Sequence, residues 1–532
     1  MHYCKSGAIN MKFSVRPVRA AQWLLPSAAC LLLAAPYALS DDTLVWARYG
    51  DIDTLDPHGA TSTLSMQVWH QIYDTLLARD SDGQPVPNMA ESWAVSDDGL
   101  MVSFNLHDDI LCHDGSAFDA EDVVYTWERA FSDSRPSNTQ SAWGPVTHID
   151  TPDSTTAVFH FSEPFAAFVP FMADPFASML CRGNEDEAGF GTSAAIGTGP
   201  WVFESWRSGD RILLSSNPDY INRGRLADNP GSPYMAELEI RVLREGQSRL
   251  AALRSGEVHI AEPPIEAVSN IQSDAELDLY IADNTGQNVF IEFAISRAPF
   301  DDVRARRAVA YAIDPDVALQ LAFGDLVNRE WCTVAQGVAG NDQDFCRSIG
   351  YEHDPEQARA LLAELGHDMN NPLEVKFMTW TGGNRQRVLQ VFQNQLRQVG
   401  INASLEVMDI GSLNAQVQTE NLTTSGRGSM DMMGWSWYDP DILHQLWHSP
   451  GAYQGYNSAE LDEMLHQTRV LSDEAERLAM VQNVQQYLIE NAVHIPLYTP
   501  GWEWLYAARS NIDGFIVGPF NQPDLIGVRL ND

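Results

Sequence analysis

The pattern of hydrophobic and polar positions predicts a strand-rich first half of the chain. Residues 101–106 alternate between apolar and polar side chains, which is typical of a half-buried strand. Further strands are predicted at 44–46 and 157–161, and as a hairpin from 201–206 and 211–214. Helices are predicted over 65–77 and over 120–131, the second capped by Asp119.

The second half predicts alternating strands and helices. Residues 373–380 and 401–408 have strand patterns and 385–398 a helical one, so together they predict a βαβ unit. Asp354 and Pro355 form a strong helix start, and Gly366 ends that helix. Helices over 458–470 and 472–491 and a strand over 494–498 follow. The fold class predicted from this order is α/β.

The N-terminus has the features of a secretory signal peptide. Lys12, Arg16 and Arg19 precede an apolar stretch, which ends at Ala38-Leu39-Ser40 before two aspartates. We expect cleavage after Ser40 whether translation starts at Met1 or Met11. A lipid anchor at Cys30 fits less well, because further apolar residues follow it. No later segment has 18 apolar residues in a row, so a periplasmic location is expected.

Charge excludes one class of partner. The 532 residues carry a formal net charge of -39, and only three of them are lysines. Nucleic-acid binding needs basic patches, so no nucleic-acid partner is expected. The acidity is compatible either with adaptation to a salty or GC-rich host, or with a field that concentrates cationic ligands.

The cysteines predict two disulfides in the exported chain. Removal of the signal leaves Cys112, Cys181, Cys332 and Cys346, which allow three connectivities. We favour Cys332 with Cys346, because the intervening glycines, Asn341 and Asp342 indicate a surface loop. Cys112 and Cys181 would then pair with each other or stay buried. There is no Cys-x-x-Cys motif for metal or redox chemistry.

Catalytic signatures are missing from the sequence. It has no Gly-rich phosphate loop ending in lysine, no Gly-x-Ser-x-Gly and no His-Glu-x-x-His. His444 and His448 have the spacing of two metal ligands on one helix face, but the third ligand and the adjacent glutamate of a zinc protease are missing. No catalytic residue, metal or cofactor is therefore predicted.

Aromatic residues gather in two loops that follow predicted strands. Trp435, Trp437 and Tyr438 form one group, and Trp380 lies between the strand and the helix of the βαβ unit. In open α/β sheets ligands bind beyond the carboxyl ends of strands, so both loops are candidate ligand contacts. The alternative is that these aromatic side chains cover the core.

Ordered motifs give the chain a resemblance to a known family. The segments that carry it span nearly the whole mature chain: 90–93, 96–99, 113–115, 119–127, 197–200, 217–220, 256–260, 299–308, 311–314 and 495–498. With these segments in this order, the chain resembles the peptide/nickel/opine-type (family 5) extracellular solute-binding proteins of ABC transporters.

The resemblance implies a two-lobed periplasmic binding protein fold of class II type, with an extra subdomain inserted in the first lobe. By analogy, the signal is 1–40, lobe I is 41–80 with 191–288 and 491–532, the inserted subdomain is 81–190, and lobe II is 289–490. The lobes would close over a ligand about a hinge. The implied function is capture of a small peptide or peptide-like solute by a monomer for delivery to a membrane permease.

The expected ligand site combines the loop argument with this resemblance, and its residues are Trp435, Trp437, Tyr438, Asp439, Trp380, Arg385, Thr61 and Ser62. Peptide-binding members usually carry an aspartate a few residues after the Gly-Trp of the strand loop. That loop is shorter here, and Asp439 is the nearest carboxylate, so Asp439 is expected to accept the ligand's donors. An oligosaccharide, an opine or an organic cation therefore remain alternative ligands. A periplasmic hydrolase, or a chemoreceptor accessory or folding-assistance protein, are the alternative classes.

Overall fold

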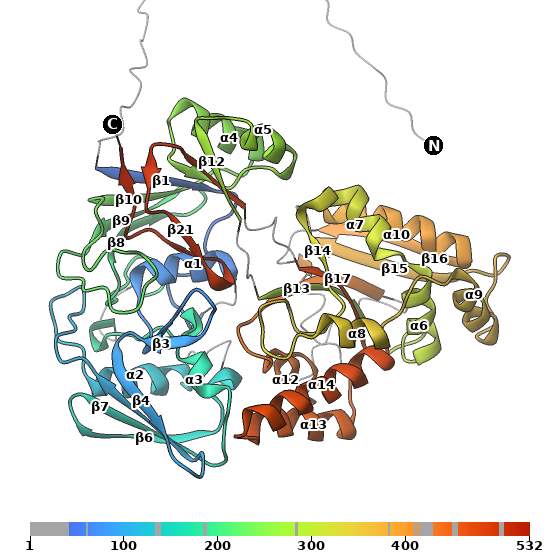
Figure 1. Ribbon diagram of the computed structural model, residues 1–532, viewed down its shortest axis with the longest axis horizontal. Helices are drawn as coiled ribbons and strands as arrows, with labels where there is room; N and C mark the ends of the chain where they lie inside the picture. The colour runs from blue at the N-terminus through green and yellow to red at the C-terminus, as the bar shows by residue number, and fades with distance from the viewer. Residues whose placement is uncertain are drawn as a thin grey trace, which may run out of the picture. The chain divides into compact units, whose positions relative to one another are not determined.

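A seven-stranded sheet is built from both ends of the mature chain. The structure is a computed structural model that describes residues 42–59, 62–132, 140–184, 189–281, 286–380, 384–408, 412–413, 429–449, 456–499 and 505–531 (Figure 1). The strand order is β12 (Leu277–Ile281), β19 (Leu505–Arg509), β11 (Ile260–Ala261), β1 (Thr43–Arg48), β10 (Glu237–Val242), β9 (Arg211–Ser216) and β8 (Trp201–Arg207). The predicted 201–206/211–214 hairpin is confirmed as the antiparallel pair β8–β9.

Strand β1 lies inside this sheet, and all six of its residues are buried. It pairs in parallel with β10 and β11, as expected for a strand covered on both faces. Helix α1 (Thr63–Ile72) follows it and is shorter than the predicted helix over 65–77. Tyr73 is extended and its hydroxyl donates to the Leu55 carbonyl at 2.9 Å, so tertiary contacts end the helix there.

A separate four-stranded antiparallel sheet lies between β1 and β8 in sequence. Its strand order is β4 (Ala90–Val95), β5 (Met101–Leu106), β7 (Thr156–Phe161) and β6 (Val146–Asp153). Helix α2 (Ala120–Ala130) begins at the predicted cap, where the Asp119 side chain accepts from the Glu121 amide. A disulfide joins Cys112 to Cys181 across 69 residues.

A six-stranded mixed sheet organises the second half. Its order is β14 (Asn328–Arg329), β18 (His494–Thr499), β13 (Gln287–Phe293), β17 (Ser429–Ser436), β15 (Leu373–Trp380) and β16 (Ile401–Met408). The predicted βαβ unit is confirmed, since β15 and β16 are parallel and α10 (Arg385–Val399) connects them. Strand β18 belongs to this sheet, although the boundary expected at 490 assigns it to the first lobe.

Helices cover both faces of the six-stranded sheet. Phe377 of β15 stacks on Phe392 of α10 on one face. His494 of β18 stacks on Trp447 of α12 (Ile442–Trp447). The strand register aligns His494 with Glu292, Asp431 and Met378 across the sheet. Because neighbouring residues on a strand point to opposite faces, Met378 and Phe377 lie on different faces. The His494–Trp447 contact is therefore on the opposite face from Phe377.

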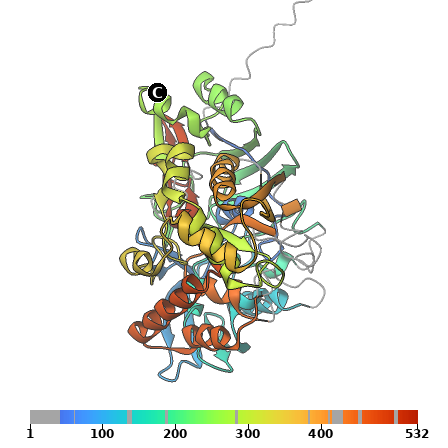
Figure 2. The same ribbon diagram turned by 90° about the vertical axis from the view of Figure 1, so that its right-hand side faces the viewer.

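The C-terminal helices also follow the predicted order. Helices α13 (Ala459–Val470) and α14 (Glu474–Glu490) lie side by side in both views (Figures 1 and 2). The expected pairing of Cys332 with Cys346 is present, the second cysteine lying on α8 (Gln343–Ile349). None of the helices in the described part of the chain has the length and hydropathy needed to span a bilayer. The expected signal segment, 1–40, lies outside the described residues.

Candidate functional site

The loop after β17 packs its aromatic side chains against helical segments from the first half of the chain. Trp437 and Tyr438 are each 8% exposed and stack on each other, with ring centroids 5.2 Å apart. Trp437 also stacks on Phe176 of the short helix η2 (Pro175–Ala177) at 5.9 Å. Tyr438 stacks on Phe171 of α3 (Phe168–Phe171) at 6.3 Å. The two residues therefore form a contact between the first and second halves of the chain.

A buried arginine, Arg79, lies against the ring of Tyr438. The guanidinium of Arg79 lies 4.5 Å from the Tyr438 ring centroid and 5.0 Å from that of Phe520. It donates to the carbonyls of Gly83 at 3.0 Å and Pro170 at 2.7 Å. Burial raises the pKa of the neighbouring Asp174 to about 6, an effect that Arg79 partly offsets. Arg79 thus makes cation–π contacts with the rings of Tyr438 and Phe520.

Asp439 is already neutralised within the protein. Arg477 of α14 donates to Oδ1 at 2.5 Å and to Oδ2 at 3.1 Å, and the Asp441 amide donates to Oδ1 at 2.8 Å. Asp441 is paired in the same way with Arg469. The expectation that Asp439 accepts the ligand's donors is therefore not supported by its geometry. Its contacts indicate that it anchors the loop to α14.

Trp380 and Arg385 meet across the connection between β15 and α10. The Arg385 guanidinium lies 3.8 Å from the Trp380 ring centroid, and Arg385 is 5% exposed. Asn384 precedes the helix with a φ of 55°, and its side-chain amide donates to the Ala322 carbonyl at 2.9 Å. This anchored turn fixes Arg385 as the first residue of α10. Residues 381–383 of the expected loop lie outside the described residues.

Strand register brings Trp380 and Trp435 to one face of the six-stranded sheet. Met378 lies opposite Asp431, and Trp380 and Trp435 follow these residues at even spacing along β15 and β17. Asn288 of β13 is the cross-strand partner of Trp435. Side chains two or four residues apart on a strand share a face, so these three point to the same side of the sheet.

Asn288 is a candidate that the sequence reasoning missed. It is 3% exposed, and its amide donates to the carbonyls of Cys332 at 2.7 Å and Thr333 at 3.0 Å. Its Oδ1 and the Trp437 Nε1 are buried and have no hydrogen-bond partner among the described residues. The only sequence signal for Asn288 was its position, after Gln287 and directly before the apolar run 289–291. The Trp437 backbone N–H donates to the carbonyl of Gly286, two residues before Asn288. The loop after β17 is therefore adjacent to the start of β13.

In the first half, the segment before α1 is held by an ion pair. Arg129 of α2 donates through both terminal nitrogens to the carboxylate of Asp56 and contacts His58 Nδ1 at 3.0 Å. Burial lowers the pKa of His58 to about 4. Ser62 caps α1 through its carbonyl, which accepts from Ser65 and Met66, while its half-buried side chain makes no capping bond. Thr61 lies outside the described residues.

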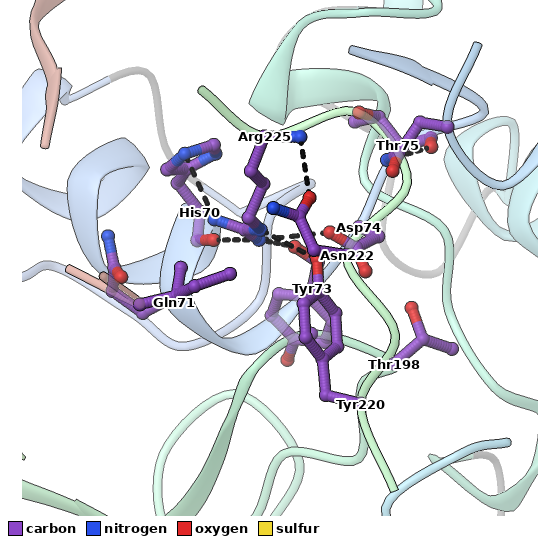
Figure 3. Close-up of polar contacts among 12 residues, drawn as sticks. His70, Gln71, Tyr73, Asp74, Thr75, Thr198, Tyr220, Asn222 and Arg225 are labelled. Atoms are coloured by element: carbon purple, nitrogen blue, oxygen red, sulfur yellow. Dashed lines mark hydrogen bonds and ion pairs between the residues drawn. The ribbon is translucent and has the colours of Figure 1, made fainter. Parts of the chain in front are cut away.

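The other end of α1 is fixed by Arg225 (Figure 3). Its guanidinium donates to the Tyr220 hydroxyl at 2.8 Å, the His70 carbonyl at 2.6 Å and the Asp74 carboxylate at 2.9 Å. A cavity of about 40 Å³ adjoins this network, with Asp524 also in its wall. Such a volume holds water rather than a peptide-sized ligand. The network therefore fixes the C-terminal end of α1.

The class of protein follows from this fold and from its relatives. Residues 84–457 match the bacterial extracellular solute-binding proteins, family 5 (middle region). The chain belongs to this family. It is a solute-binding protein of the kind that serves ABC importers, with the two-lobed α/β fold of periplasmic binding proteins.

Individual relatives cover nearly the whole chain. The glutathione-binding protein GsiB of Escherichia coli K12 is 28% identical over 512 residues, which cover 92% of this chain and 95% of GsiB. DppA of Helicobacter pylori, solved with the peptide STSA, has a TM-score of 0.78 at 22% identity and covers 92% of this chain and 98% of its own. AgaA of A. tumefaciens R10, solved with agropinic acid, has a TM-score of 0.77 at 24% identity and covers 91% and 98%.

Proposed function

We propose that this chain is the extracytoplasmic subunit that captures a small peptide-like solute bearing a carboxylate and delivers it to the permease of an ABC importer. The observation that carries this proposal is the Arg385–Trp380 stack on the six-stranded sheet, with Trp435 and Asn288 on the neighbouring strands. The names of the relatives support it, since they include a glutathione-binding protein and a peptide complex. Periplasmic location and a monomeric state are part of the proposal.

The chemistry of these groups suits such a ligand. A guanidinium recognises a carboxylate through two parallel hydrogen bonds, and it also stacks on aromatic faces. Tryptophan rings supply flat apolar contact at low entropic cost. The Asn288 Oδ1 can accept an amide N–H, and the Trp437 Nε1 can donate to a carbonyl. A peptide-like molecule carries all three complementary groups.

The 437–441 loop offers no unpaired carboxylate that could bind the amino group of a peptide. Asp439 and Asp441 are each paired with an arginine, so neither carboxylate of the 437–441 loop is left uncompensated. We therefore expect the carboxylate and the backbone of the ligand to dominate binding. Opines also carry carboxylates, so they are tested beside peptides in the binding screen below.

A thermal-shift screen identifies the ligand. Glutathione, di- and tetrapeptides and opines are added to the mature protein, and a ligand at about 100 times its Kd should add about 2.7 kcal/mol of stability. Mass spectrometry of the mixture after incubation should recover the ligand unchanged. A new hydrolysis product would instead favour the periplasmic hydrolase.

The role of Arg385 is tested against a matched residue on the same helix. Arg385→Ala should weaken binding of the identified ligand by about 2–3 kcal/mol, because it removes a charge-assisted hydrogen-bond donor. Arg387→Ala is the control, since Arg387 lies two residues further along α10 and is exposed. Equal affinities of the two variants by calorimetry would overturn the proposed carboxylate contact.

A further inference from the structure

Two histidines and an aspartate gather on the outer face of the four-stranded sheet. His148 of β6 is the cross-strand partner of His160 of β7, and their rings stack with centroids 4.2 Å apart. Asp150 follows two residues after His148, so its side chain is on the same face, and its Oδ2 lies 3.1 Å from His160 Nε2. Ile149 and Phe159, one residue away on each strand, pack instead into or against the core.

The spacing of these donors is close to that of a metal site. One donor atom from each of the three residues lies within 4.8 Å of the others. In a tetrahedral site with bonds of about 2.0–2.1 Å, neighbouring ligand atoms are about 3.3 Å apart. The His160–Asp150 pair already has this separation. His148 and Asp150 are exposed, so small side-chain rotations can bring the third donor into range.

A neighbouring hydroxyl orients one imidazole for coordination. The Thr147 hydroxyl donates its proton to the His160 carbonyl at 3.1 Å and lies 3.0 Å from His148 Nδ1. Because that proton is already used, the hydroxyl oxygen accepts a hydrogen bond from Nδ1–H of His148. The Nε2 lone pair of His148 is then available for a metal. An outer partner of this kind is typical of histidine metal ligands.

We propose that His148, Asp150 and His160 bind a divalent first-row transition metal, such as Zn²⁺ or Ni²⁺. Imidazole with one carboxylate suits these ions, whereas Mg²⁺ and Ca²⁺ prefer sites made only of oxygen ligands. The ion would link β6, which is the edge strand of its sheet, to β7, with water completing its coordination. Binding replaces the proton on His160 Nε2, which passes to solvent. The strongly negative net charge favours accumulation of cations near the protein.

The experiment uses mature protein without a polyhistidine tag, dialysed against a chelator. Titration with Zn²⁺ in a non-coordinating buffer, followed by calorimetry, should give one ion per chain. Mg²⁺ in excess should not displace it. The double variant His148→Gln/His160→Gln should weaken Zn²⁺ binding by at least about tenfold, and Asp150→Asn should weaken it less.

The matched control is the other stacked histidine pair. The rings of His444 and His448 also lie 4.2 Å apart, but burial and the nearby Arg469 guanidinium lower the pKa of His444 to about 2. The same surroundings that oppose a proton there also oppose a divalent cation. The variant His444→Gln/His448→Gln should keep the wild-type Zn²⁺ affinity. Loss of binding in this variant, or unchanged binding in His148→Gln/His160→Gln with a wild-type circular dichroism spectrum, would overturn the proposal. Absence of any Zn²⁺ binding to the wild-type chain would overturn it as well.

Discussion

The Asp439–Arg477 pair offers a direct test of whether the loop after β17 contacts the ligand through its carboxylate. The side chains of the two residues are only 5% and 11% exposed. Replacing Arg477 by methionine would leave the Asp439 carboxylate buried without its main partner. Breaking a buried ion pair on one side costs about 3–5 kcal/mol. With an unfolding entropy of about 2.1 cal/mol/K per residue, a chain of this size loses about 1 °C per kcal/mol, so the melting temperature should fall by roughly 3–5 °C.

The double variant separates the two roles of Asp439. Asp439→Asn/Arg477→Met removes both charges, so much of the stability lost in Arg477→Met should return. Differential scanning calorimetry of wild type, both single variants and the double variant completes a double-mutant cycle. If Asp439 only anchors the loop, the double variant should bind the screened ligand with nearly wild-type affinity. An Arg477→Met cost of less than about 1 kcal/mol would refute the anchoring role. A stable double variant that fails to bind would show that Asp439 also contacts the ligand.

Three further predictions concern pH, the disulfides and the aromatic loop. Burial raises the pKa of Asp431, which lies opposite Glu292, to about 8 from its ordinary 3.8, so the folded chain retains a proton that the unfolded chain has lost. Because of this retained proton, the free energy of unfolding falls as pH rises from about 4 to 8. Asp431→Asn removes the titrating group, so it should stabilise the protein by about 1–3 kcal/mol at pH 8 but not at pH 4, as measured by urea titrations. Replacing both cysteines by serine should lower the free energy of unfolding by about 4 kcal/mol for Cys112–Cys181 and by about 3 kcal/mol for Cys332–Cys346. The first disulfide closes 69 residues and the second 14, and the longer loop restricts the unfolded chain more. Equal losses would contradict this chain-entropy argument. Trp437→Ala should destabilise the protein by about 3–5 kcal/mol through loss of its stacked contacts, and an unchanged melting temperature would show that Trp437 does not belong to the packed interior.

Local rules were sufficient for the elements whose signals lie within a few residues. The βαβ unit was predicted because strand and helix periods are legible in the chain itself, and β15 and β16 have the predicted bounds. The caps at Asp119 and Asp354 worked for the same reason. Helix α1 was predicted too long because it ends where Tyr73 reaches Leu55, 18 residues earlier in the sequence. That contact leaves no local signal.

The sequence by itself determined the family, the α/β class, the set of four cysteines and the aromatic content of the two loops. Only the tertiary structure decided what those loops contact. Trp437 and Tyr438 pack on Phe176 and Phe171, more than 250 residues away, and Asp439 pairs with Arg477 of helix α14. The same holds for His148 and His160, which become neighbours only through antiparallel pairing of β6 with β7. Such side chains acquire a role from partners distant in sequence, because burial and charge compensation depend on the whole fold rather than on a local pattern.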